Sequence, residues 1–160
     1  MDQKILDLLR REGRLSVKDV SHRLGLSEEE TKARIQQLEK DRVILGYRAV
    51  VNPRNLGEDY VLSLIEVRVQ PQRDVGFDAI AARIYRYPEV KTCYLLSGTY
   101  DLLLIVEGKS LKEVSEFVAS KLSTLEYIQG TVTHFMLKKY KEDGLLMDGE
   151  EELERLAVSP

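Results

Sequence analysis

The sequence predicts an α+β protein, in which an N-terminal winged helix-turn-helix is joined to a C-terminal ferredoxin-like βαββαβ domain. Three observations support this fold class. Short amphipathic helices are separated by a turn at Gly25, a β-rich segment follows them, and residues 60–140 then alternate between strand and helix patterns. With 160 residues, the chain has room for two small domains.

Three helices are expected at the N-terminus. Residues 2–12 repeat apolar side chains at helical spacing. Ser16, with Asp19 three residues later, predicts a capping box at the start of the second helix. Gly25 stands where a helix favours a left-handed residue, and Ser27 begins the third helix. Two helices separated by a tight glycine turn predict a helix-turn-helix.

A β-rich segment follows the third helix. Residues 43–51 are mostly apolar, with Gly46 near their centre, and they predict a short β wing that completes a domain over residues 1–51. Residues 52–59 contain several turn residues and predict the linker.

Residues 60–140 predict the order strand, helix, strand, strand, helix, strand. The first helix begins near Phe77 and ends before Pro88, and Gly98 predicts a hairpin between the middle strands. The second helix, 110–122, is expected to bury a stripe made of Leu111, Val114, Val118 and Leu122. This order is that of a split βαβ, or ferredoxin-like, domain.

Two of the expected strands are apolar on both faces. Between residues 100 and 107, one face carries Leu102, Leu104 and Val106, and the other carries Leu103 and Ile105. Both helices of this fold cover the same sheet face, and burying a Leu or Ile is worth roughly 1.5–3 kcal/mol. We therefore expect a second subunit to cover the other face. The alternative is a face left partly wet, as antiparallel sheets allow when it is polar.

The last part of the chain, residues 141–160, is predicted to be an acidic tail. Two alternatives within it are a short helix at 150–156 and a strand at 155–158. His134 alternates with Val132 and Met136, which suggests a place at a sheet interface.

Composition excludes several function classes. The net charge is −3, with 11 basic and 9 acidic residues among the first 50, which favours an anionic partner at the N-terminus only weakly. Cys93 is the only cysteine and the two histidines are isolated, so neither a disulfide nor a metal site is expected. No nucleophile motif or phosphate loop is present, and no cofactor is expected. Without a signal peptide pattern or long apolar run, a cytoplasmic location is expected.

Particular motifs resemble a known family. They are Leu24-Gly25-Leu26-Ser27, Arg34-Ile35-x-x-Leu38-Glu39-Lys40, Val43-Ile44-x-Gly46-Tyr47, Tyr87-Pro88-Glu89-Val90 and Ser97-Gly98-Thr99-Tyr100-Asp101. Over about residues 1–140 the chain resembles the Lrp/AsnC, or feast/famine, transcription regulators. The resemblance implies a winged helix-turn-helix that binds double-stranded DNA and a C-terminal domain that dimerises through its sheet. It also implies higher homo-oligomers such as octamers, and an amino acid effector bound between dimers near the hairpin.

The third helix is the expected recognition helix. On a helical wheel, Thr31, Ile35 and Leu38 face the other helices, and the opposite side is polar. Glutamine amides match adenine edges, and basic side chains match phosphates. The alternative is an ordinary solvated surface. The predicted DNA-binding residues are Ser27, Glu29, Lys32, Arg34, Gln36, Gln37, Lys40 and Arg48.

Three glutamates stand at the start of this helix, and their negative charge opposes the approach of DNA. All three lie in the first turn, where the helix dipole favours acids. Glu30 completes a capping box with Ser27 and stands four residues before Arg34, a favourable order for an ion pair. Glu29 remains on the outward face, where it either reads a cytosine or weakens DNA affinity.

The expected effector site is the hairpin, with residues Ser97, Gly98, Thr99, Tyr100 and Asp101. Asp101 would suit an amino acid's ammonium group, and its alternative role is to accept hydrogen bonds within the turn. Ligand binding there would shift the assembly state and so the spacing of the DNA-binding parts.

Two other functions remain open from the sequence. Sirohaem decarboxylases share the two-domain architecture, but they are expected to carry a histidine just after the Pro-Glu-Val stretch. Here that stretch is Lys91-Thr92-Cys93-Tyr94. A ligand-binding oligomer with a vestigial helix-turn-helix is the other alternative.

Overall fold

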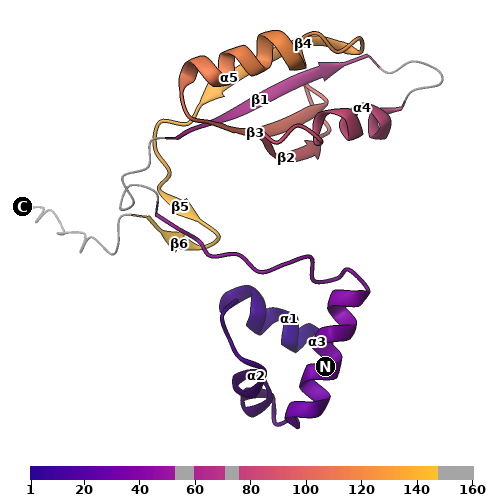
Figure 1. Ribbon diagram of the computed structural model, residues 1–160, viewed down its shortest axis with the longest axis vertical. Helices are drawn as coiled ribbons and strands as arrows, with labels where there is room; N and C mark the ends of the chain where they lie inside the picture. Colours follow the sequence, from indigo (N-terminus) through magenta and orange to yellow (C-terminus); the bar gives the residue numbers. More distant parts are fainter. Residues whose placement is uncertain (53–59, 71–75, 148–160) are drawn as a thin grey trace, which may run out of the picture. The chain divides into compact units, whose positions relative to one another are not determined.

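The computed structural model describes residues 1–52, 60–70 and 76–147, which form two compact units, Met1–Val51 and Asn52–Pro160 (Figure 1). The predicted linker residues 53–59 lie outside the described residues, as do the helix and strand expected within 150–158.

The N-terminal unit consists of α1 (Asp2–Arg11), α2 (Val17–Leu24) and α3 (Glu28–Lys40). Its core is formed by Ile5 of α1, Val20 of α2 and Leu38 of α3. Partly buried apolar residues pack around these three, so each helix contributes its amphipathic face to one small core, as the periodicity predicts.

Capping hydrogen bonds lie at the ends of these helices. The Ser16 hydroxyl accepts from the Asp19 backbone N–H, and the Asp19 carboxylate accepts from the Ser16 N–H in return, which is a complete capping box. Gly25 ends α2 with φ +67°. The Ser27 hydroxyl accepts from the Glu30 N–H, but the Glu30 carboxylate binds Arg34 instead, so the predicted box at α3 is only half formed.

The helix α3 ends in a turn that the sequence did not predict. The N–H of Val43 donates to Leu38 O and the N–H of Arg42 donates to Glu39 O, which is the bonding pattern of a Schellman motif. Arg42 therefore has φ +58°, a conformation that glycine normally supplies.

The predicted β wing at 43–51 is wrong, because the structure has no strand in this segment. Five of its large apolar side chains are exposed, those of Val43, Leu45, Tyr47, Val50 and Val51. A strand requires a hydrogen-bonded neighbour, and no neighbouring strand accompanies these residues among those described.

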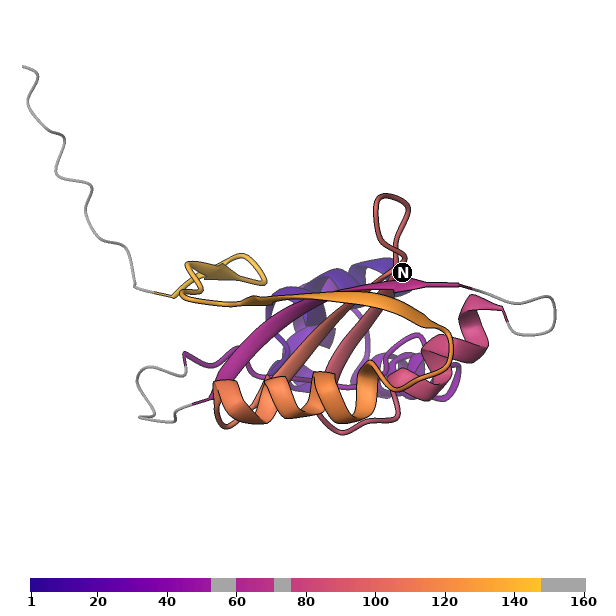
Figure 2. The ribbon, with the colours of Figure 1, turned by 90° about the horizontal axis from the view of Figure 1, so that it is seen from above.

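The C-terminal unit has the predicted βαββαβ order. Its elements are β1 (Val61–Val69), α4 (Phe77–Ile84), β2 (Val90–Leu95), β3 (Leu102–Gly108), α5 (Leu111–Phe117), the π-helical turn η2 (Val118–Leu122) and β4 (Ile128–Phe135). The sheet order is β2-β3-β1-β4 and every pair is antiparallel. Figure 2 shows α4 and α5 on one side of the sheet and the β2–β3 loop on the other.

The predicted alternation of residues between the two faces of the central strands β1 and β3 is confirmed. Ile65 and Val67 of β1 and Leu102 and Leu104 of β3 are buried under the helices, and residues between them are half-buried on the open face. The expected stripe of α5 needs one correction. Leu111 is 55% exposed, and Phe117 takes the core position, packing edge to face on Tyr87.

A small hairpin replaces the first part of the predicted tail. Strands β5 (Lys141–Glu142) and β6 (Leu145–Leu146) are joined by Asp143 and Gly144, both with positive φ. This is the geometry of a two-residue type I′ turn, for which Asp-Gly is a preferred sequence. Met147 behind it is buried, and its carbonyl accepts from the Asn52 amide.

None of the described helices is long and apolar enough to cross a membrane.

Candidate DNA-binding and effector sites

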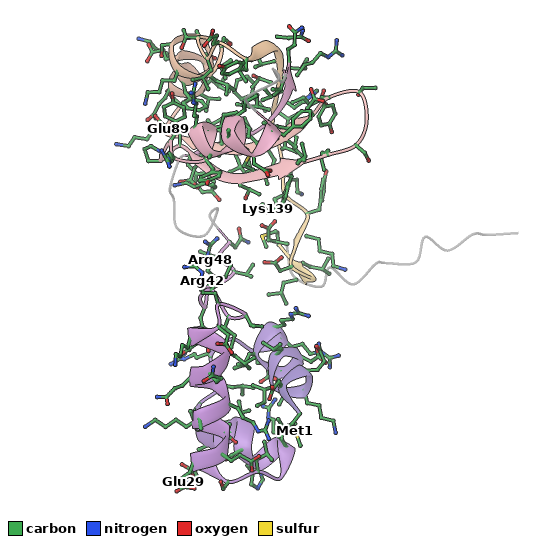
Figure 3. The ribbon with its side chains drawn as sticks, turned by 90° about the vertical axis from the view of Figure 1, so that its right-hand side faces the viewer. Met1, Glu29, Arg42, Arg48, Glu89 and Lys139 are labelled. Atoms are coloured by element: carbon green, nitrogen blue, oxygen red, sulfur yellow. The ribbon has the colours of Figure 1, made fainter. Side chains whose placement is uncertain are left out.

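The helix α3 presents the face that the wheel predicts. Thr31, Ile35 and Leu38 pack inward, and Thr31 and Leu38 are buried. The opposite side exposes Glu29, Lys32, Ala33, Gln36, Gln37 and Lys40. Glu29 lies at one end of α3 and points away from the other two helices (Figure 3).

Two of the predicted DNA contacts are held by other side chains. The Arg34 guanidinium donates to Glu30 Oε1 through Nε and Nη2, at 3.1 and 2.9 Å, and its Nη1 donates to Asp2 Oδ1 at 2.9 Å. These bonds raise the pKa of Arg34 and tie α3 to α1. The Gln37 amide donates to both carboxylate oxygens of Asp41 at 2.8 and 2.9 Å.

Three other predicted contacts are exposed and carry no side-chain hydrogen bond or ion pair within the described part of the chain. They are Lys32, Gln36 and Lys40. Because their side chains are not engaged by carboxylates of the protein, these three are better placed to reach phosphates and base edges than Arg34 or Gln37.

The segment after α3 is attached to it by one polar contact. The Tyr47 hydroxyl donates to Glu39 Oε1 at 3.0 Å, and desolvation together with this bond raises the pKa of Tyr47. Arg48, the predicted wing contact, is exposed beside it on an extended segment rather than on a strand (Figure 3).

Asp101 has a structural role in the loop between β2 and β3. Its Oδ2 accepts from the Val69 backbone N–H at 2.7 Å, its own N–H donates to Val67 O, and its carbonyl accepts from Leu96 N–H. Val69 follows the irregularity in the pairing of β1 with β4, where the ladder shifts register. The carboxylate therefore binds a backbone donor of β1 at this irregularity, whereas the alternative role expected from the sequence was to accept hydrogen bonds within the turn.

A cavity of about 630 Å³ lies on the helix-free side of the sheet, where β1 and β4 meet the same loop. Two predicted effector residues, Thr99 and Tyr100, line it. Ser97, Gly98 and Asp101 belong to the loop but are not among the lining residues. Six lining residues were not predicted from the sequence: Glu66, Arg68, Gln129, Gly130, Thr131 and Val132.

The sequence does hold a signal for two of these residues. Glu66 and Arg68 place opposite charges at alternate positions of an otherwise apolar strand. Burying charge in an apolar face is costly unless a partner or solvent is present, so such residues indicate a wet or functional place in the sheet.

Cys93 and His134 lie on the sheet of the C-terminal unit. Burial raises the pKa of the Cys93 thiol, whereas an activated nucleophile needs a lowered one. No group of three or more His, Cys, Asp or Glu residues in the described ranges is arranged to hold a metal ion. His134 lies 3.2 Å from Glu66 through its Nε2, on the open face of the sheet.

Family models match both units. A model of the AsnC-type helix-turn-helix domain matches residues 1–39, and a model of the Lrp/AsnC ligand binding domain matches residues 62–146. The chain belongs to the Lrp/AsnC family. The resemblance in its sequence motifs is thereby confirmed, and so is the two-domain α+β fold.

Relatives of this Lrp/AsnC protein are similar over nearly their whole length. The uncharacterized HTH-type transcriptional regulator YugG of Bacillus subtilis is 41% identical over 99% of this chain and 96% of its own. A proline dehydrogenase transcriptional activator of Rhizobium radiobacter is 32% identical over 90% of this chain and 92% of its own. The crystal structure of transcriptional regulator NMB0573 of Neisseria meningitidis, a complex with L-Met, is 30% identical with a TM-score of 0.71, covering 88% of this chain and 90% of that one.

These findings confirm the predicted class of function. The chain is a DNA-binding transcriptional regulator of a family whose C-terminal domain binds ligands. The relatives are named as regulators, not as enzymes.

Proposed function

We propose that this Lrp/AsnC regulator binds double-stranded DNA in the cytoplasm with the outward face of α3. The observation that carries this proposal is the exposure of Lys32, Gln36 and Lys40, without side-chain partners, on the face opposite the Thr31–Leu38 core. Lysines neutralise phosphates, and a glutamine amide matches the N6 and N7 edge of adenine.

The effector is an amino acid, and its place is the cavity beside the β2–β3 loop. Relatives support the ligand class, since they include a leucine-responsive regulatory protein of Haemophilus influenzae and a regulator solved with L-Met. The cavity supports the place, because it is concave, partly polar and built from the loop that the sequence motifs indicate.

The working form is a homodimer whose subunits meet on the open face of the sheet. Leu62, Leu64, Leu103 and Ile105 are only half-buried there, and Tyr94 is exposed. Association through this face would bury these side chains and place two copies of α3 in one assembly, so that avidity adds to a modest affinity per helix. An effector that changes the assembly would change the spacing of these helices.

The first experiment measures binding of the full chain to DNA from upstream of its own gene. Fluorescence anisotropy at low salt should show saturable binding that is tighter than binding to a shuffled duplex of equal length. The double variant K32Q/K40Q should bind both duplexes more weakly, because it removes two phosphate contacts. Absence of binding to either duplex at low salt would sink the proposed DNA-binding role.

A further inference from the structure

Two opposite charges stand side by side in the effector cavity. Glu66 and Arg68 are two residues apart on β1, so their side chains leave the same face of the strand, with their backbone positions roughly 7 Å apart. Both line the cavity. In the part of the chain that the structure describes, their charged ends do not come within 4 Å of each other.

Each charge is held in place by one contact and keeps capacity for another. Arg68 Nη2 donates to the carbonyl of Thr99 at 3.1 Å, which directs the guanidinium toward the β2–β3 loop. Glu66 Oε1 lies 3.2 Å from His134 Nε2. A guanidinium has five N–H donors and a carboxylate has two oxygens, so both groups can still bind a ligand.

Asp101 does not compete for the positive end of such a ligand. The residue is not part of the cavity lining. Among the lining residues Glu66 is the one acidic side chain, and Arg68 is the one basic side chain. The cavity therefore presents one negative and one positive group at separate points.

We infer that Glu66 and Arg68 recognise the zwitterionic end of a free α-amino acid, with Arg68 binding the carboxylate and Glu66 the ammonium. The assignment rests on the proposed amino acid effector and adds which atoms select it. A guanidinium binds a carboxylate with two parallel hydrogen bonds, and a carboxylate binds an ammonium at short distance. Amines, simple carboxylic acids and amino acid amides each satisfy one of the two groups and are selected against.

Gly130 lines the cavity opposite Arg68 and leaves open space there. It pairs with Arg68 across the β1–β4 ladder, and a Cβ built on it meets nothing within 4 Å. A large side chain at this position would therefore extend into the cavity without displacing neighbouring atoms near the backbone.

The test is calorimetry on the full chain with each of the twenty standard L-amino acids, followed by two derivatives of the strongest binder, its α-amide and its deaminated acid. R68Q and E66Q should each weaken binding of the amino acid about ten- to hundredfold, as expected for a lost hydrogen bond to a charged group. R68Q should leave binding of the amide unchanged, and E66Q should leave binding of the deaminated acid unchanged. R86Q, which removes an exposed arginine outside the cavity, should bind like the wild type.

The variant G130L should abolish binding by filling the cavity, while G130A should retain it. Thermal melts verify that every variant is folded. If R68Q and E66Q bind the amino acid as tightly as the wild type, the zwitterion assignment is wrong and the amino acid effector stands. If none of the twenty amino acids binds the wild type, both the assignment and the proposed effector are wrong.

Discussion

The two units of this regulator differ in how many side chains their stability depends on. In the described residues the N-terminal core has three buried side chains, those of Ile5, Val20 and Leu38, whereas the C-terminal core has eleven. Small domains bury a smaller fraction of their surface and are correspondingly marginal. The DNA-binding unit should therefore respond to a single core change far more than the ligand-binding unit does.

Both units pair charges on their surface, and the C-terminal unit also keeps two opposite charges apart in its cavity. In the N-terminal unit, Arg34 binds Asp2 and Glu30, and Arg23 binds Glu12. In the C-terminal unit, Glu66 and Arg68 face the cavity without binding each other. Charges that pair within the protein help hold helices together, while charges kept apart remain for a ligand. The proposed function therefore names fewer DNA contacts, and the proposed effector site more residues, than the sequence predicts.

The largest effect should come from the smaller core. Replacing Ile5, which is fully buried, by Ala should cost about 2–5 kcal/mol, because it leaves a cavity where all three helices meet. Calorimetry should show the N-terminal unit melting in a separate, earlier transition. The control L45A, at a side chain 79% exposed, should melt like the wild type. A uniform downward shift of one transition would contradict the independence of the two units.

The second-largest effect on stability is expected in the β2–β3 loop of the C-terminal unit. Asp101→Ala should destabilise this unit by about 1.5–3 kcal/mol, because it leaves the Val69 N–H without its charged acceptor. Asp101→Asn keeps an acceptor oxygen and should recover part of the loss. Urea unfolding followed by far-UV circular dichroism measures both. Equal stability of the Ala variant and the wild type would show that the bond contributes nothing.

A change at the end of α3 should stabilise the smaller unit. Arg42 adopts φ +58°, which costs an L-residue roughly 1 kcal/mol relative to glycine. Arg42→Gly should therefore raise the melting temperature of the N-terminal unit. Arg42→Ala removes the same charge but keeps the Cβ, and it should not stabilise. If both variants behave alike, relief of backbone strain is not the cause.

Two basic residues of α3, one unpaired and one ion-paired, should differ in how they affect the salt dependence of DNA affinity. Lys32→Gln removes a free cation, so the slope of log affinity against log salt should fall by about 0.9. Arg34→Gln removes a cation already bound to Glu30 and Asp2, and it should leave this slope nearly unchanged. Anisotropy titrations across salt concentrations compare the two. A larger loss for Arg34 would mean that its ion pairs open on DNA.

The smallest effect is expected at Glu29. Its carboxylate is exposed on the outward face of α3, so Glu29→Ala should raise affinity for non-specific DNA modestly by removing repulsion from phosphates. Glu28→Ala serves as a comparison in the same helical turn. Unchanged affinity at every salt concentration would place Glu29 away from the phosphates.

Local features of the fold could be predicted from the sequence because they depend on residues three or four positions apart. The Ser16–Asp19 capping box, the left-handed Gly25 and the Ser27 cap are of this kind. The presence or absence of the β wing could not be predicted in this way, because a strand exists only where another segment pairs with it. The hairpin at Asp143-Gly144 carries a local signal, but it lies in a polar stretch whose composition predicts a tail.

For the sites too, features set by near neighbours could be predicted from the sequence, and features set by tertiary contacts could not. Exposure of Lys32, Gln36 and Lys40 follows from helical periodicity, so the outward face of α3 was correct. The partners of Arg34 and Gln37 depend on which neighbouring carboxylate lies nearest once the helix has formed. Thr99 and Tyr100, which the sequence predicts as effector residues, line the cavity, but Glu66 lies more than 30 positions earlier in the chain and reaches it only through strand pairing.

The sequence by itself determined the order of the elements, the helix caps, the apolar alternation of β1 and β3, and the family. Each of these is set by periodicity or by contacts between near neighbours. The tertiary structure decided that Asp101 binds the Val69 backbone, that Arg34 is tied to α1, and that Glu66 and Arg68 share a cavity with the β2–β3 loop. Those outcomes depend on which atoms meet when distant segments pack, and the local pattern of residues does not record that.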